Sequence, residues 1–414
     1  MQIVPRSILG VGRVGSDLLR LCRCWCPPGF ARRDAPVMAS VSAHLNLDRP
    51  SHMDRLSRSI YKPWSLIPFA CNTTKCMDTD NLRTKVTDES EYHPTVDGIY
   101  FTSVLTNSSH RDGAIYNNKL IQKEFLEVDI ADCAETRLEP MMFSKPTERC
   151  LPDAENCMYH FPQQIFQFFS VRLSKSPISN GPIQLYGYIA ARDERDGMLN
   201  YVVSYSRDDP IVVHQGDLIE MTGPKRCISM DSIVLIEFDM RIKNEALEDD
   251  DQQLIDGAIS CSCYNYIAWK PVVNRITGSS GAVDVSLAVV EHAVEATIEV
   301  VISQVLSGLN LSLSSFVDVM DVYEEIKLFN GKIGQSGSLR RFVVSVSHGT
   351  TMLLMFKLGN NVQGSLHGCA NRQMKFQAKL HGHASQQIKL KFATISVKVT
   401  WSTIVDYVSS ISIV

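Results

Sequence analysis

Residues 232–243 have the sequence Ser-Ile-Val-Leu-Ile-Glu-Phe-Asp-Met-Arg-Ile-Lys, in which two kinds of residue alternate. One phase is wholly apolar: Val234, Ile236, Phe238, Met240 and Ile242. The other phase is mostly charged: Leu235, Glu237, Asp239, Arg241 and Lys243. Because successive side chains of a β-strand point to opposite faces, this alternation predicts an antiparallel strand with one buried and one solvated face. We therefore expect Phe238 to be buried and Leu235 to be comparatively exposed.

Strand-like segments continue on both sides of this stretch. Upstream, residues 166–173 are aromatic and β-branched, and the apolar run 182–190 follows a turn at Ser179-Asn180-Gly181. Immediately downstream, the run from Glu245 to Asp256 is acidic and contains no base, so we expect a solvated connection there. Further on, Ala296, Ile298, Val300 and Ile302 alternate with more polar residues, which indicates another strand.

The last third of the chain also contains strand-like segments. Residues 342–346 and 352–358 flank His348-Gly349, which predicts a hairpin. The uncharged stretch 300–317 carries Ser, Gln and Asn throughout, so two strands and a turn are expected there and not a transmembrane helix. Near the C-terminus, the apolar phase changes after residue 392, which predicts a β-bulge at Ala393-Thr394.

These segments predict a mainly β protein with an antiparallel, sandwich-like core in two β lobes and a mostly irregular N-terminal region. We divide the chain into a disordered or targeting leader (1–37), a variable and poorly structured region (38–135) and a β domain (136–414). Within the β domain, the two sublobes are expected at 160–270 and 280–414.

Composition excludes several classes of protein. The 414 residues carry 41 Lys and Arg against 45 Asp and Glu, a net charge of −4. This balance excludes a strongly basic nucleic-acid binder and an acidic disordered tail protein. The 12 cysteines are spread along the chain without a repeating frame, which favours reduced thiols over a disulfide scaffold. No segment predicts a membrane span.

The leader differs from the rest of the chain because it is rich in arginine. Its arginines are Arg6, Arg13, Arg20, Arg23, Arg32 and Arg33. Such a segment is typical of transit peptides to the mitochondrion or plastid, whereas an unstructured extension before Met38 leaves the protein in the cytoplasm or nucleus. We favour the second interpretation. Residues 10–15 match G-x-G-x-x-G, but Pro5 and Arg6 make a poor buried strand before them, so no dinucleotide site is expected.

The β domain carries a spaced set of motifs. They are residues 165–171, 181–193, 200–201, 206–210, 218–226, 237–239 and 294–300. This set resembles DUF6598, a plant domain-of-unknown-function family abundant in grasses, and the similarity runs from Arg137 to the C-terminus, about two-thirds of the chain. One departure is Gln167-Phe168-Phe169, which looks like an insertion and leaves the register of its strand open. The resemblance implies no biochemical activity; because some members are fused to ribosome-inactivating domains, it implies a link with plant stress or defence.

An enzyme would have to be recognised from the residues themselves. A ribosome-inactivating N-glycosidase needs a Glu-Ala-x-Arg helix, and the nearest match, Glu295-Ala296-Thr297-Ile298, has Ile in the Arg place and the period of a strand. A solvated Glu295 is therefore expected. The run Gly334 to Ser338 fails G-x-S-x-G because Ser338 replaces the second glycine, and no phosphate-binding loop occurs.

Two groups of residues have the chemistry of metal ligands. The pairs are His367/Cys369 and His381/His383. On a strand, residues two apart point to the same side, so the four side chains could converge on a zinc ion. Alternatively, the two pairs are polar residues beside glycines in two loops that bind no metal. The leader's Cys22, Cys24 and Cys26 are too closely spaced for most zinc sites. We favour no zinc.

A second group combines acids and arginines. The acids are Asp193, Asp196, Asp208 and Asp209, and the arginines among them are Arg192, Arg195 and Arg207. The acids alone would suit Ca²⁺, but the arginines favour structural ion pairs. We therefore assign no catalytic, cofactor or metal residue and expect no cofactor. The expected function is a non-enzymatic interaction or accessory module with an unknown protein partner and without membrane or strong nucleic-acid binding; the alternative is a hydrolase or glycosidase.

Overall fold

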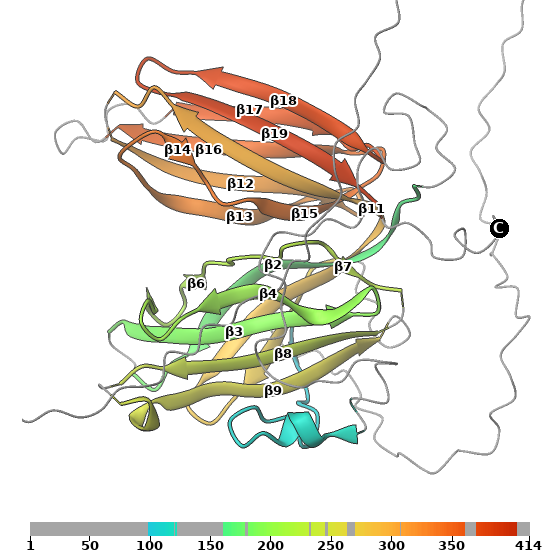
Figure 1. Ribbon diagram of the computed structural model, residues 1–414, viewed down its shortest axis with the longest axis vertical. Coiled ribbons are helices and arrows are strands. Elements are labelled where there is room, and N and C mark those ends of the chain that lie inside the picture. The colour runs from blue at the N-terminus through green and yellow to red at the C-terminus, as the bar shows by residue number, and fades with distance from the viewer. Residues whose placement is uncertain are drawn as a thin grey trace, which may run out of the picture. The chain divides into compact units, whose positions relative to one another are not determined.

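The computed structural model describes residues 98–119, 121, 160–178, 181–231, 233–244, 247–262, 270–306, 308–360 and 370–403. All of them belong to one unit, Thr84–Val414. The predicted leader, Ser232 and most of the predicted variable region lie outside the described residues. The described chain is mainly β, as the sequence predicted, and the helical elements whose bounds lie wholly within the described residues are two short 3₁₀ turns (Figure 1).

The described residues up to Thr277 form ten strands. They are β1 (Ile99–Phe101), β2 (Gln163–Lys175), β3 (Ile183–Asp193), β4 (Asp196–Tyr205), β5 (Ile211–Val213), β6 (Leu218–Ile219), β7 (Ile228–Ser229), β8 (Ile233–Ile242), β9 (Gln252–Ser262) and β10 (Val272–Thr277). The two 3₁₀ turns are η1 (Ala114–Asn117) and η2 (Glu248–Asp250).

The second part adds nine more. They are β11 (Ala282–Ser303), β12 (Leu309–Val319), β13 (Val322–Ile333), β14 (Gly337–Ser338), β15 (Phe342–Ser347), β16 (Thr351–Asn360), β17 (Ala370–Gln377), β18 (Gly382–Lys389) and β19 (Thr394–Ser402). Among the described strands, pairing is antiparallel except between β1 and β10.

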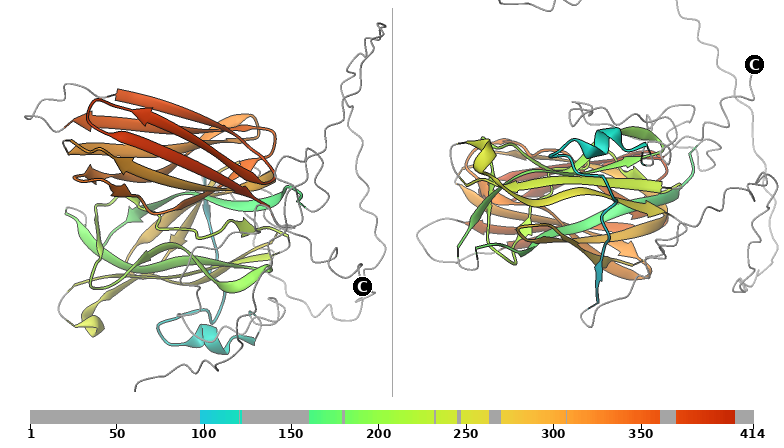
Figure 2. Two further views of the ribbon diagram at one scale, coloured as in Figure 1. Left: turned by 45° about the horizontal axis from the view of Figure 1, so that its top comes forward. Right: turned by 90° about the horizontal axis from the view of Figure 1, so that it is seen from below.

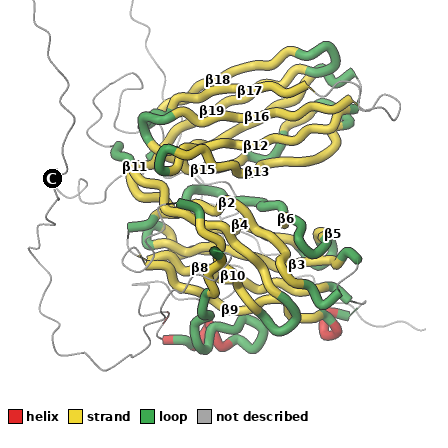
Figure 3. Tube along the Cα trace, turned by 180° about the vertical axis from the view of Figure 1, so that it is seen from behind, coloured by secondary structure: helices red, strands yellow, loops and turns green. Residues whose placement is uncertain are grey.

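Three sheets build two lobes (Figures 1 and 3). In the first lobe, the sheet β4-β3-β8-β9 packs against β2, β10 and the first half of β11. In the second lobe, the sheet β13-β12-β16-β17 packs against β15, β18, β19 and the second half of β11. The strand β11 therefore belongs to both lobes. Its first half pairs with β10 and β2, and its second half with β15 and β19.

The two halves of β11 meet at an irregular point. The pairing with β2 shifts register between Val290 and Ala293, and His292 between them adopts a left-handed φ of 45°. Unpaired residues in a β-bulge bend a strand, and this bend directs β11 from one lobe into the other.

The strand boundaries and the pairing of β2 with β11 bear on two sequence predictions. The stretch 300–317 forms the end of β11, a turn and β12, as expected. The open register at Gln167-Phe168-Phe169 corresponds to a β-bulge, because Phe168 and Ser170 pair with consecutive residues of β11 and leave Phe169 without a partner in the ladder.

The predicted hairpin at His348-Gly349 and the predicted bulge at Ala393-Thr394 were wrong. A turn at His348-Gly349 is present, but β15 pairs with β11 while β16 pairs with β12 and β17, so the chain crosses from one sheet to the other and forms no hairpin. Near Ala393-Thr394, the chain forms no bulge. Instead it reverses between β18 and β19, which pair with each other. In both cases the apolar pattern located the strands but not their partners.

The prediction for β8 was half right. Phe238 is fully buried between the sheets, but Leu235 on the opposite face is also 0% exposed. Residues between Leu105 and Ile121 cover its face. We call residues 98–119 and Ile121 together the cover segment, which begins with β1 beside β10 and is cyan in Figure 2. Leu235 packs there with Ile115, Ile121 and Ala258 in a small second core.

Candidate functional site

The cover segment is fixed to the edge strand β9 by backbone contacts. The Leu105 amide donates to the Ala258 carbonyl at 2.8 Å, and the Ala258 amide donates to the Ser108 hydroxyl at 3.0 Å. Gly257 permits this approach, because it has φ +137° and a Cβ there would lie 2.4 Å from the Val104 side chain. Backbone hydrogen bonds and close packing therefore position the cover segment on β9 independently of its charged side chains.

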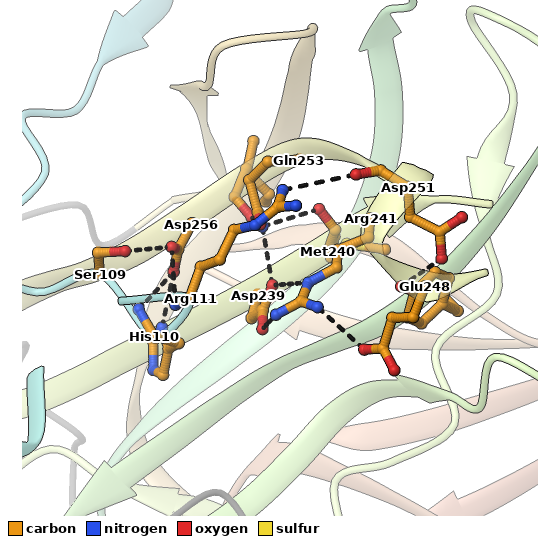
Figure 4. A network of polar contacts seen from close by, with 12 residues as sticks. Ser109, His110, Arg111, Asp239, Met240, Arg241, Glu248, Asp251, Gln253 and Asp256 are labelled. Carbon is orange, nitrogen blue, oxygen red and sulfur yellow. Dashed lines mark hydrogen bonds and ion pairs between the residues drawn. The ribbon is translucent and has the colours of Figure 1, made fainter. Parts of the chain in front are cut away.

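His110 of the cover segment lies between two carboxylates. Its Nδ1 is 2.9 Å from Asp256 Oδ1, and its Nε2 is 3.3 Å from Glu237 Oε2. The amide of His110 also donates to Asp256 at 2.8 Å, and the Ser109 hydroxyl donates to the other Asp256 oxygen (Figure 4). Glu237 is on β8 and Asp256 is on β9, where it pairs with Asp239. The two carboxylates that flank His110 therefore come from neighbouring strands.

Glu237 continues this network into the sheet. Arg192 on β3 donates from Nε to Glu237 Oε1 at 2.6 Å and from a terminal nitrogen to the Gly197 carbonyl at 2.6 Å. Glu237 and Arg192 are each 1% exposed. An ionised pair so deeply buried needs further hydrogen bonds to offset desolvation, and here Arg192 also bonds to the Gly197 carbonyl and Glu237 to His110.

The charges of this network determine its chemistry. Burial alone would lower the pKa of His110, but hydrogen bonds to Asp256 and Glu237 and their negative charges outweigh burial and raise the pKa to about 9. Burial would raise the pKa of Asp256, yet its hydrogen bonds from His110, Ser109 and Arg111 lower the pKa to about 2. At neutral pH the cluster is therefore an imidazolium between two carboxylates.

The trio Ser109, His110 and Asp256 has the composition of a hydrolase triad but the wrong arrangement. In a triad, the serine hydroxyl bonds to the imidazole nitrogen that will take its proton. Here the Ser109 hydroxyl donates to Asp256, and Nε2 of His110 faces the Glu237 carboxylate. An imidazole that is already protonated cannot act as a general base. The network can hold the cover segment, and it cannot activate Ser109.

A neighbouring part of the network surrounds Asp251. Tyr186 donates to its carboxylate at 2.7 Å and Arg207 at 2.6 Å. Arg241 bonds to Asp239 and Glu248 on the same face (Figure 4). The prediction that the acidic run is a solvated connection was therefore wrong for Asp251, which is 3% exposed because its negative charge meets a guanidinium and a phenol.

The acid and arginine group forms ion pairs, as the sequence favoured, but with partners that the sequence did not indicate. Arg192 pairs with Glu237, Arg195 with Asp231 and Arg207 with Asp251. Asp193 is buried and takes two bonds from Arg226, at 2.5 and 2.9 Å. Asp208 and Asp209 are solvent-facing, and nothing is described for the Asp196 side chain.

Glu295 is not the solvated residue that the strand pattern predicted, since it is 0% exposed. Its carboxylate accepts bonds from the Cys227 amide and the Ser402 hydroxyl, both at 2.7 Å, and the Cys227 thiol lies 3.3 Å from the Ser345 hydroxyl. Burial, followed by the charge of Glu295, raises the pKa of the Cys227 thiol well above its ordinary value. A buried thiol that stays protonated is a poor nucleophile.

The candidate zinc pairs, for which no zinc was favoured, do not come together in the described part of the chain. His367 and Cys369 lie outside it, as do Cys22, Cys24, Cys26 and residues 10–15. His381 is buried with its ring 5.3 Å from that of His160, while His383 on β18 is exposed. Among the described residues, no three His, Cys, Asp or Glu side chains are grouped so that they could hold a metal ion.

A groove of about 690 Å³ opens between the lobes. The strands β2, β5 and β6 form one wall and β13 forms the other. Its lining is mixed, with apolar residues such as Val212, Leu218 and Phe329 beside charged ones: Arg172, Asp217, Glu220, Glu325 and Lys327. Val212 is 61% exposed within it. Among the described strands β13 pairs only with β12, so its other edge has no strand partner.

Arg340 joins the two walls of this groove, because its partners Met221 and Leu328 line opposite walls. Its guanidinium donates to the Thr222 carbonyl at 3.2 Å and to the Leu328 carbonyl at 3.0 Å, and it also bonds to the Met221 carbonyl. It lies over the Phe342 ring, 4.5 Å from the centroid. A planar donor with several N–H groups suits this bridging role, because it satisfies carbonyls of both lobes at once.

Sequence reasoning missed His110, Asp256 and Arg340. His110 and Asp256 are 146 residues apart, and Arg340 is 118 residues from Thr222. The local signal at His110 was a lone histidine in a polar stretch, which indicates no partner. The sequence placed Glu237 on a charged face, and a charged face does not reveal whether another segment covers it.

Comparison with known proteins identifies the family. None of the described helices is long and apolar enough to cross a membrane. No curated protein matches the sequence. Among solved structures, human GIVD cytosolic phospholipase A2 matches with 10% identity over 60% of this chain and 31% of its own, at a TM-score of 0.22. The same human enzyme in complex with methyl gamma-linolenyl fluorophosphonate matches with 9% identity over 58% and 32%, at 0.20.

These structural matches span about a third of the enzyme's length and are too weak to carry an inference. The sequence model of a family gives a firmer result. The model for the domain of unknown function DUF6598 matches residues 165–399, more than half of the chain. The matched region begins in β2 and ends in β19, and so contains both lobes. The chain belongs to the DUF6598 family.

Proposed function

We propose that this protein is a non-enzymatic interaction module that holds an extended segment of a partner polypeptide in the groove between its lobes. The observation that carries the proposal is the groove itself, which has a volume of about 690 Å³ and in which exposed apolar side chains such as Val212 lie among charged ones. Pockets of this size are typical of ligand sites, and an exposed apolar lining has a cost in water that a partner removes.

The edge strand β13 in the wall of the groove favours an extended polypeptide. One of its walls is β13, an edge strand in the described part of the chain. A peptide can add to such an edge through main-chain hydrogen bonds, while alternate side chains enter apolar pockets. Residues such as Val212 and Leu218 on the opposite wall would receive those side chains.

The ionisable groups of the described residues support a binding role over catalysis. Groups of the kind that catalyse hydrolysis, such as His110, Glu237, Glu295 and Cys227, are bonded to one another or to the backbone and are buried. A catalytic group must reach its substrate. Because Glu295 is enclosed, we expect no depurination of ribosomal RNA in an aniline-cleavage assay. The stress or defence setting stays a prediction from the family resemblance.

The groove can be tested with a phage-displayed library of random linear 12-residue peptides selected on the full chain. Enriched peptides are then labelled, and their affinity is measured by fluorescence polarisation on wild type, Val212→Glu and Leu306→Glu. Val212 is 61% exposed in the groove, and Leu306 is 79% exposed outside it, so neither change should disturb the fold. We expect Val212→Glu to bind at least about tenfold more weakly, since it buries a charge against an apolar peptide.

The control Leu306→Glu should bind like wild type. The proposal is wrong if no peptide is enriched, or if the enriched peptides bind Val212→Glu as tightly as wild type.

A further inference from the structure

The tip of the β12–β13 hairpin exposes three apolar side chains that are close in sequence. Met320 is 62% exposed, Val322 56% and Tyr323 45%. Single exposed apolar residues are common on protein surfaces, whereas several together usually mark an interaction site. The lining residues of the inter-lobe groove on β13 begin at Glu325, so this tip is a separate surface.

The backbone of the tip is unfavourable for its sequence. Val319 pairs with Val322, and the two residues between them, Met320 and Asp321, have φ of 55° and 64°. A two-residue turn with both φ values positive prefers Asn-Gly, because other side chains are strained in the left-handed region. Folding stability therefore does not explain Met320, and an exposed methionine suits recognition, since its flexible side chain adapts to a partner.

The charges around the tip indicate the partner's chemistry. Residues 317–326 contain Asp318, Asp321, Glu324 and Glu325 and no Lys or Arg. An acidic surface of this kind is repelled by anionic lipid and attracted by basic groups. The Tyr323 hydroxyl donates to the Thr351 carbonyl at 3.2 Å, which holds the ring in place before binding.

We propose that the hairpin tip, residues 318–324, docks into a partner protein that presents an apolar pocket ringed by Lys and Arg. Met320, Val322 and Tyr323 fill the pocket, and Asp318, Asp321 and Glu324 face the basic ring. Because the hairpin is rigid and ordered by its ladder, little conformational freedom is lost when it binds.

The test uses the full chain with a photo-crosslinking p-benzoylphenylalanine at position 322, irradiated in extract of the cells that produce the protein. The matched control carries the same group in place of Val301, which is 44% exposed on another sheet. Mass spectrometry then locates the attachment site on the crosslinked protein. We expect one partner at position 322 only, attached beside Lys or Arg residues, with a yield that falls as ionic strength rises.

Two variants separate the roles of charge and shape. Asp318→Asn with Asp321→Asn and Glu324→Gln keeps the shape, and we expect at least about a tenfold loss of crosslinked product. Met320→Asn with Asp321→Gly relieves the turn, and we expect the Tm to rise by about 1–3 °C while the product is lost, so that unfolding cannot explain the loss.

Any of four results would overturn the proposal. The first is a yield of crosslinked product no higher than that of the Val301 control, and the second is attachment to another copy of this chain. The third is a yield that the charge variant does not reduce. The fourth is that the wild type binds vesicles of phosphatidylcholine and phosphatidylserine more tightly than the Met320→Asn, Asp321→Gly variant does.

Discussion

Two outward faces of this molecule have similar sequences and opposite surroundings. The covered face belongs to β3, β8 and β9 in the first lobe and includes Leu235 and Glu237, which are 0% and 1% exposed. The open face belongs to β11 and β19 in the second lobe and includes Val301 and Glu299, whose side chains are 44% and 30% exposed. In the sequence, β8 and β11 both alternate apolar residues with polar or charged ones. Alternation shows which face is polar, and only a distant segment decides whether that face is wet.

The same contrast separates the ion pairs. Glu237 bonds to Arg192 and His110 away from water, whereas Glu299 pairs with Arg341 and Lys398 in a solvent-facing groove of about 650 Å³. Solvent and mobile ions screen the second set but not the first. Charges that look equivalent in the sequence should therefore contribute very differently to stability.

The largest effect is expected from Glu237→Ala. It leaves Arg192 and His110 buried without their shared counter-charge, and removal of one partner of a buried pair costs about 3–5 kcal/mol. The matched change on the open face, Glu299→Ala, should cost at most about 1 kcal/mol. Equilibrium unfolding in urea measures both. Equal costs for the two variants would show that the two faces do not differ in exposure.

A slightly smaller effect is expected on the apolar residues of β8. Leu235→Ala removes a side chain that packs with Ile115 and Ile121, and we expect a loss of about 2–4 kcal/mol, close to the roughly 3–5 kcal/mol for Phe238→Ala. The simple alternation of β8 would make the first loss much smaller than the second. Urea unfolding of both variants decides between these outcomes, and a loss below about 1 kcal/mol for Leu235→Ala would mean that the cover segment does not pack on the sheet.

The third effect depends on pH. The pKa of His110 is about 9 in the folded protein, against 6.5 for the unfolded residue. The stability from its protonation is therefore fully present below pH 6.5 and is lost as pH rises from 6.5 to 9. We expect this loss to be on the order of 2–3 kcal/mol, measured as the free energy of unfolding at a series of pH values.

His110→Gln should remove this pH dependence, and His383→Gln, which changes an exposed histidine, should keep it. A wild-type stability that is constant between pH 6.5 and 9 would contradict the arrangement of His110 between Asp256 and Glu237.

Much of the fold could be predicted because its signal is local. The alternation in β8 and β11 and the turn before β12 follow from side-chain periodicity, which each strand carries in its own residues. The pairing of β15 and β16 could not be predicted in this way. Both strands are apolar, and which sheet each joins depends on contacts with strands far away in the sequence.

The sites were less predictable for the same reason. Periodicity placed Glu295 on a strand but wrongly in solvent, because its partners Cys227 and Ser402 are 68 and 107 residues away. The hairpin tip at Met320 had a local signal, since Met-Asp is an unusual pair for a two-residue turn. That signal becomes visible only once the turn type is known.

Amide hydrogen exchange of the full chain tests the central claim, that the cover segment is fixed on the first lobe. The Leu105 amide donates to the Ala258 carbonyl and the His110 amide to Asp256, so both should exchange far more slowly than in an unstructured peptide. In Glu237→Ala both should exchange faster, while amides of β12 and β16 in the second lobe keep their protection. Exchange of Leu105 and His110 in the wild type at the rate of an unstructured peptide would contradict the account.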